Sequence, residues 1–197
     1  MDTATRTWTR RIAAAVLVVA AAVGLGAGRA VPARPALTLH GADAVQERTV
    51  DWAMRRFRAG GLEGLPPLEV VLHGSRTPCD GYLGLYLAGR IDLCTEGLLE
   101  PYARKFALHE MAHAWTEANL PDEVLDRFLR IRGIATWNDQ RLPWKERGAE
   151  QAAEIITWGL GEGEIAPLLP TPVDAETLAS LYVLLTGRAP ITLAAAG

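Results

Sequence analysis

The segment that decides the fold and the chemistry of this chain is His109-Glu110-Met111-Ala112-His113. It lies within residues 102–118, none of which breaks a helix and most of which favour one. Two histidines four positions apart lie on the same helix face, separated by about 6 Å along the axis. At that separation, one nitrogen of each ring can reach a single metal ion at roughly 2.0–2.1 Å. The segment therefore predicts a helix that carries two metal ligands.

Glu110 directly follows the first histidine, so it lies beside the metal without binding it. From there a carboxylate can accept a proton from a metal-bound water, which is the division of roles in the H-E-x-x-H pattern. A lone core histidine is usually just a hydrogen-bonded side chain. Two histidines at this spacing around a glutamate indicate a metal site that takes a third ligand from elsewhere in the chain. On these residues the chain resembles the zincin metallopeptidases.

The third ligand decides which zincin family the chain resembles. A metzincin would continue the helix as H-E-x-x-H-x-x-G-x-x-H. Here Thr116 and Asn119 stand where the glycine and the third histidine should be, which excludes that family. Glu117 shares the helix but lies about 12 Å along the axis from His109, too far to bind the same ion. We therefore expect the third ligand in another segment.

The better candidate is the run Arg147-Gly148-Ala149-Glu150-Gln151-Ala152-Ala153-Glu154, in which two glutamates four apart share a helix face. This run is similar to the gluzincins, the thermolysin-like group, whose third ligand is a glutamate on a later helix. The resemblance implies that Glu150 is the ligand and that Glu154 holds the free ring nitrogen of a ligand histidine, which fixes its tautomer. The group more usually has Asp at the second position. Asp139 and, more weakly, Glu146 are rival ligands, and a solvated acidic helix face is the structural alternative.

The resemblance implies a zinc metallopeptidase of α+β, zincin-like fold, in size a minimal gluzincin. A small mixed sheet with a hairpin would pack on the active-site helix, and the remainder would be mainly helical. One Zn²⁺ would be held by His109, His113 and Glu150, with Glu110 as general base and then proton donor to the leaving amine. Tyr182 is the tyrosine best placed downstream to stabilise an oxyanion, although its apolar neighbours favour a core role. The rival interpretation is a non-enzymatic, zincin-like binding module. Glu110 argues against it, because a structural site needs no base.

The first 30 residues have the pattern of a secretory signal. Arg6, Arg10 and Arg11 precede an apolar run over residues 12–25, and Gly28-Arg29-Ala30 is an acceptable cleavage site. The run is shorter than the ~20 residues of a membrane span, and an uncleaved N-terminal anchor is the alternative. We expect a secreted protein, with a signal peptide over 1–30, a linker over 31–40, a metallopeptidase domain over 41–190 and a tail over 191–197.

The charge and the cysteines agree with this expectation. The chain has 20 basic and 23 acidic residues and no basic cluster, so we expect a peptide or protein substrate and no nucleic-acid partner. Cys79 and Cys94 are the only cysteines, and in an oxidising compartment they most simply pair with each other. Closing a loop of that size can contribute ~3 kcal/mol to stability.

The remaining pattern predicts a short strand, a hairpin and further helices. Residues 68–73 form an apolar, β-branched run typical of a strand, and residues 82–93 predict a hairpin that turns at Ala88-Gly89. In zincin folds the edge strand of such a sheet can hold extended substrate backbone, which is an analogy of fold only. We assign no role to His40 or His73. Helices are expected over residues 42–59, 101–119, 122–132, 149–160 and 174–186, with a structured loop over 134–147.

Overall fold

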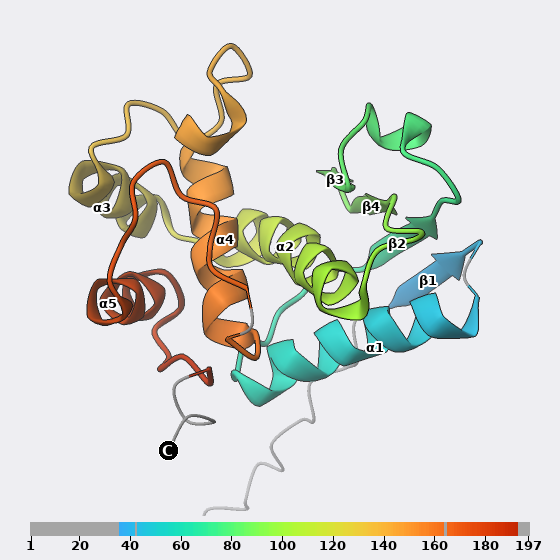
Figure 1. Ribbon diagram of the computed structural model, residues 1–197. Helices are drawn as coiled ribbons and strands as arrows, with labels where there is room; N and C mark the ends of the chain where they lie inside the picture. The colour runs from blue at the N-terminus through green and yellow to red at the C-terminus, as the bar shows by residue number, and fades with distance from the viewer. Residues whose placement is uncertain (1–35, 42, 164, 193–197) are drawn as a thin grey trace, which may run out of the picture. The chain divides into compact units, whose positions relative to one another are not determined.

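The computed structural model describes residues 36–41, 43–163 and 165–192 of the 197-residue chain. These residues form five α-helices and a four-stranded mixed sheet, which confirms the predicted α+β class (Figure 1). They belong to one unit, residues 33–197. Within the described ranges, no helix is both long and apolar enough to cross a membrane. The predicted signal peptide lies outside these ranges.

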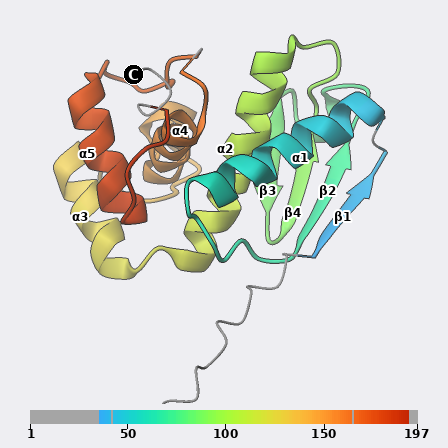
Figure 2. The same cartoon turned by 90° about the horizontal axis from the view of Figure 1, so that it is seen from below.

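The sheet has the strand order β1-β2-β4-β3 (Figure 2). Strands β1 (Leu37–His40), β2 (Leu68–Leu72) and β4 (Arg90–Leu93) run parallel, and β3 (Gly84–Leu87) is an antiparallel edge strand. The prediction of a linker over 31–40 is wrong for Leu37–His40, because these residues pair with β2 in a register that begins at Leu37 and Leu68.

The predicted hairpin and disulfide are confirmed. Ala88 and Gly89 both have positive φ, 47° and 85°, as a two-residue turn of the mirror-image type requires. A disulfide joins Cys79 to Cys94, whose Cα atoms lie 6.3 Å apart. Both cysteines are buried, and Cys94 donates its backbone N–H to the carbonyl of Leu83 just before β3. The disulfide therefore fixes the open end of the hairpin.

The helices follow the sequence closely. Asp43 caps the first helix through a reciprocal bond with Gln46, Gly133 ends the third in a left-handed conformation, and Asp174 caps the last. The five helices are α1 (Ala44–Ala59), α2 (Glu100–Asn119), α3 (Asp122–Arg132), α4 (Gly148–Leu160) and α5 (Ala175–Thr186).

Helix α2 is the centre of the fold. It packs against α1, against α4 and against β3, while α4 also contacts α5 (Figures 1 and 2). Fully buried alanines on the two central helices, among them Ala112, Ala152 and Ala153, have little volume, so the backbones of α2 and α4 can approach closely. This close approach sets the side chains of α2 facing those of α4.

The predicted tail over 191–197 is wrong for its first two residues. The backbone N–H groups of Ile191 and Thr192 both donate to the carbonyl of Gly159 near the end of α4, at 2.9 and 3.2 Å. Ile191 also packs against the core. Residues 193–197 lie outside the described ranges.

Candidate metal centre

Three side chains from the two central helices converge on one point. Oε2 of Glu150, in the first turn of α4, lies 3.0 Å from Nε2 of His109 and 3.2 Å from Nε2 of His113. The two Nε2 atoms are 3.1 Å apart. Among the residues that the structure describes, this is the one group of three or more His, Cys, Asp or Glu side chains close enough to hold a metal ion.

The donor atoms of this group fit a metal ion. Ligand atoms at roughly 2.0–2.1 Å from a tetrahedral metal lie about 3.3 Å from one another, close to the separations of 3.0–3.2 Å seen here. An imidazole that carries its proton on Nδ1 presents a lone pair at Nε2. Two such lone pairs and a carboxylate oxygen repel one another at this distance unless a cation lies between them. The set of two imidazoles and one carboxylate is therefore a candidate metal centre.

The carboxylate of Glu154 contacts the ring of His109 at Nδ1, the nitrogen that faces away from the candidate metal position. Its Oε1 lies 3.3 Å from Nδ1 of His109, at ion-pair distance, and neither atom has another partner. Its Oε2 accepts the backbone N–H of Leu168 at 2.7 Å and lies 3.0 Å from Nζ of Lys105. Such a carboxylate holds a ligand imidazole in one tautomer and one orientation. The side chain of Glu154 thus reaches the ring of His109 from the following turn of α4.

The charges around this group favour a positive charge at its centre. Burial by itself raises the pKa of Glu154, but His109, Lys105 and the backbone N–H of Leu168 together outweigh it and lower that pKa to about 2. The pKa of Glu150 is likewise held well below its usual range by both histidines despite burial. Burial lowers the pKa of His109, yet its bonds to the two carboxylates raise that pKa to about 10. Two ionised carboxylates thus surround a centre that stabilises a cation.

Glu110 lies next to this group without joining it. Its side chain is buried, with 5% exposed, although it lines the same cleft as the ligands. Burial raises the pKa of this carboxyl, while the neighbouring histidines and a hydrogen bond from the backbone of Tyr86 oppose the rise. A carboxyl with a raised pKa beside a metal site is suited to accepting and returning a proton.

The cleft has a volume of about 520 Å³ and opens beside the three donor atoms. Edge strand β3 forms one wall and the loop between α3 and α4 forms another. Trp144 of that loop lies over His109, with 6.0 Å between the ring centroids. The residues that line the cleft besides the candidate ligands and Glu110 include Tyr82, Gly84, Tyr86, Glu117, Trp137, Asn138 and Arg147.

Tyr182 has the core role that its apolar neighbours favour, and it is not placed to stabilise an oxyanion. The residue is fully buried in α5, its ring lies against Gly159, and it does not line the cleft. Burial raises the pKa of its phenol to about 12, as expected of a core tyrosine. The rival ligand Asp139 is not part of the candidate metal group; Arg141 binds both of its carboxylate oxygens at 2.7–3.2 Å.

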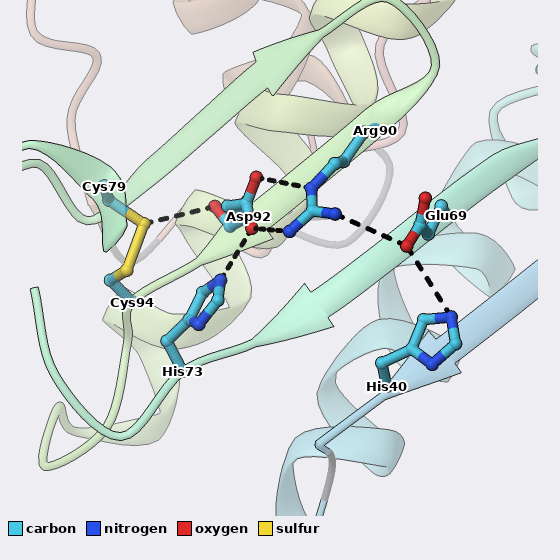
Figure 3. A network of polar contacts seen from close by, with 7 residues as sticks. All are labelled: His40, Glu69, His73, Cys79, Arg90, Asp92 and Cys94. Carbon is cyan, nitrogen blue, oxygen red and sulfur yellow. Dashed lines mark hydrogen bonds and ion pairs between the residues drawn. A yellow bond between two sulfur atoms is a disulfide. The ribbon is translucent and has the colours of Figure 1, made fainter. Parts of the chain in front are cut away.

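The other two histidines lie in a separate network on the face of the sheet turned away from the core (Figure 3). Nε2 of His73 is 2.6 Å from Oδ1 of Asp92, and the guanidinium of Arg90 binds both oxygens of Asp92 at 2.8 and 2.9 Å. His40 lies 3.6 Å from Glu69, which also contacts Arg90 at 3.5 Å. This network connects β1, β2 and β4. Within the described part of the chain, neither His40 nor His73 belongs to a group of side chains close enough to hold a metal ion.

Sequence reasoning missed two residues that shape the site, Lys105 and Gly84. Lys105 stands one helical turn before His109, and that spacing is a signal that it shares the buried face. Gly84 lies in an otherwise β-favouring run, where a glycine indicates close approach of another group.

Comparison of the chain with protein-family models, with curated proteins and with solved structures gave no match.

Proposed function

We propose that this chain is a zinc-dependent metallopeptidase of the gluzincin type. The observation that carries the proposal is the convergence of His109, His113 and Glu150 on one point, with Glu110 beside it in the same cleft. Two histidines and a glutamate are a ligand set of catalytic zinc sites in hydrolases, which keep a position free for water or substrate. The buried carboxylate of Glu154 behind His109 supports the choice of zinc, because such partners strengthen an imidazole as a ligand.

Zinc bound there would polarise a peptide carbonyl and lower the pKa of water toward neutrality. The chain itself would then supply the proton transfers. Glu110 accepts a proton from the attacking water and passes it to the leaving amine. Its raised pKa supports this role, since general bases work best when their pKa approaches the working pH. Trp144 covers His109 and limits the access of bulk water to that ligand.

The proposed substrate is a peptide or a protein segment in extended conformation. Strand β3 pairs with β4 on one side only, so alternate backbone groups of its other edge point away from the sheet. An extended peptide can add to such an edge through backbone hydrogen bonds. Glu110 and the three candidate ligands line the cleft beside β3, which supports an extended peptide as the substrate.

Export of the protein is part of the same proposal. The disulfide between Cys79 and Cys94 supports it, because such bonds persist in oxidising compartments. The signal pattern of residues 1–30 is the sequence basis, with an uncleaved membrane anchor facing outward as its alternative.

The variant Glu110→Gln tests the proposed activity. It keeps the size and shape of the side chain but removes its basicity, and Glu110 is not among the candidate ligands. We expect zinc content and melting temperature close to wild type, with peptide hydrolysis lower by ~10²-fold or more. Glu117→Gln is the control, because Glu117 lies on the same helix and lines the same cleft but is exposed. This control should lose far less activity.

One result would refute the enzyme and favour the binding module. Wild-type protein that binds one zinc per chain yet cleaves nothing in a diverse peptide library contradicts the proposed activity. A protein partner retained equally by the wild type and by Glu110→Gln would then indicate a module that binds without catalysis.

A further inference from the structure

Strand β3 comes against Glu110 at the one residue of the strand that has no side chain. A methyl group built on Gly84 would lie 2.7 Å from Cγ and 2.8 Å from Cδ of Glu110, and closer still to Oε1. Carbon atoms in ordinary contact are 3.4–4 Å apart, so any side chain at this position would overlap the carboxylate. The neighbouring atoms belong to the side chain of Glu110, which is 5% exposed, so the carboxylate gives way by turning into the cleft that it lines.

The backbone of Gly84 does not explain the glycine. Its φ is not among the positive values of the described residues, and it pairs with Leu93 in regular antiparallel register. Glycine weakens a strand because it adds backbone entropy to the unfolded chain and provides no side chain to pack. The contact with Glu110 is the feature of this position that requires a glycine.

The same strand contacts the carboxylate a second time. The backbone of Tyr86, two residues further along β3, lowers the pKa of Glu110 against the effect of burial. Because a strand alternates in direction, residues 84 and 86 turn the same side toward α2. The edge strand therefore provides the space for the carboxylate at Gly84 and lies along it as far as Tyr86.

We infer that Gly84 is a positioning residue for Glu110. The missing side chain lets β3 pack directly on the carboxylate, which stays beside the metal group without entering the ligand set. Glu110 is adjacent to a ligand in sequence and would otherwise be free to turn toward the same cation. The catalytic part of this inference rests on the proposed peptidase function, whereas the contact itself does not.

The test is Gly84→Ala in the full chain, compared with Gly74→Ala. Gly74 also has ordinary backbone geometry and lies outside the cleft, and a methyl there would meet only the end of the exposed Glu96 side chain. In Gly84→Ala the carboxylate must move by at least half an ångström to restore normal contact. Misplacement of a catalytic group by about 1 Å can cost 10²-fold in rate. We expect kcat to fall by ~10–100-fold with KM within ~3-fold and unchanged zinc content, and Gly74→Ala to keep the wild-type kcat.

Two further comparisons separate positioning from general damage to the strand. Glu110→Ala removes the atoms that the new methyl would meet, so Gly84→Ala should lower the melting temperature much less in that background than in wild type. Glu110→Asp withdraws the carboxylate by one methylene, so adding Gly84→Ala to it should cost little further kcat. An equal loss of melting temperature in both backgrounds, or an unchanged kcat in Gly84→Ala, would overturn the inference. If the wild type cleaves no peptide, the proposed function fails, and the melting comparison still decides whether Gly84 accommodates Glu110.

Discussion

Replacing Lys105 with methionine tests the support behind the metal centre. Lys105 lies on α2 one turn before His109, and its Nζ is 3.0 Å from Oε2 of Glu154. Both side chains are almost completely buried, with 6% and 1% exposed. Methionine has a similar length and fits an apolar interior, so this variant removes the positive charge and leaves the packing nearly intact.

The expected loss follows from the burial of the pair. Removing one partner of a buried ion pair costs about 3–5 kcal/mol, because the remaining charge is left uncompensated. Glu154 retains the N–H of Leu168 and the contact with His109, so the lower end, about 3 kcal/mol, applies. For a chain of this size, 1 kcal/mol changes the melting temperature by about 2–4 °C. Lys105→Met should therefore melt about 6–12 °C below wild type.

The assay is thermal unfolding in chelator, followed by zinc affinity measured in competition with a chromophoric chelator. Lys145→Met is the matched control, because Lys145, the chain's other lysine, is exposed and should change the melting temperature by less than about 2 °C. The double variant Lys105→Met/Glu154→Met removes both charges and should recover most of the stability. Its zinc affinity should stay ~10–100-fold below wild type, because His109 has lost its carboxylate partner. A single variant as stable as the Lys145 control would refute this reasoning.

Three other predictions follow from the site and the sheet. Chelator should lower the melting temperature of the wild type but not of His113→Ala, since a ligand present at 100 times its Kd stabilises by about 2.7 kcal/mol; equal sensitivity would contradict the metal centre. Reduction of the disulfide between Cys79 and Cys94 should lower the free energy of unfolding by ~3 kcal/mol in urea titrations, and no change would show that the loop is held by other contacts. Arg90 holds the pKa of Asp92 below its usual value. The ionised carboxylate therefore adds to the free energy of unfolding above about pH 4, and this stabilisation is lost as the pH falls further. Asp92→Asn should be less stable than wild type by about 1 kcal/mol at pH 7 and equal to it near pH 2; a gap that is constant over this pH range would exclude the ion pair as its cause.

The elements that sequence reasoning predicted well are those defined by local signals. Helix α3 begins after Pro121 and ends at Gly133, and both residues act on the chain next to them. The hairpin turn needs positive φ at two successive positions, which Ala88-Gly89 provides within the turn itself. The spacing of His109 and His113 is likewise a property of one helix, so their shared face could be predicted without knowledge of the fold.

The errors concern contacts between distant segments. Strand β1 has only four residues, and it is a strand because it pairs in parallel with β2, which follows it after the whole of α1. Its own sequence contains no turn or periodic signal strong enough to distinguish it from a linker. Tyr182 follows Glu150 in the sequence, but α5 packs on the side of α4 that carries Gly159, and Tyr182 lies in the core. Whether Tyr182 faces the core or the cleft depends on how α5 packs on α4, which the local sequence does not determine.

The candidate site nevertheless left a signal in the sequence. Lys105, His109 and His113 recur every four residues, so the lysine shares the face of the two predicted ligands. A lysine on a buried face needs an acidic partner, because an unpaired charge in the interior is too costly. Glu150 and Glu154 share one predicted helix face, whereas the rival acids Asp139 and Glu146 lie in the loop before that helix. Combining the two requirements would have paired Lys105 with Glu154 and brought α4 against α2 in the register that the structure has. The candidate metal group of His109, His113 and Glu150 and the ion pair of Lys105 with Glu154 thus lie along one face of α2, and both join it to α4.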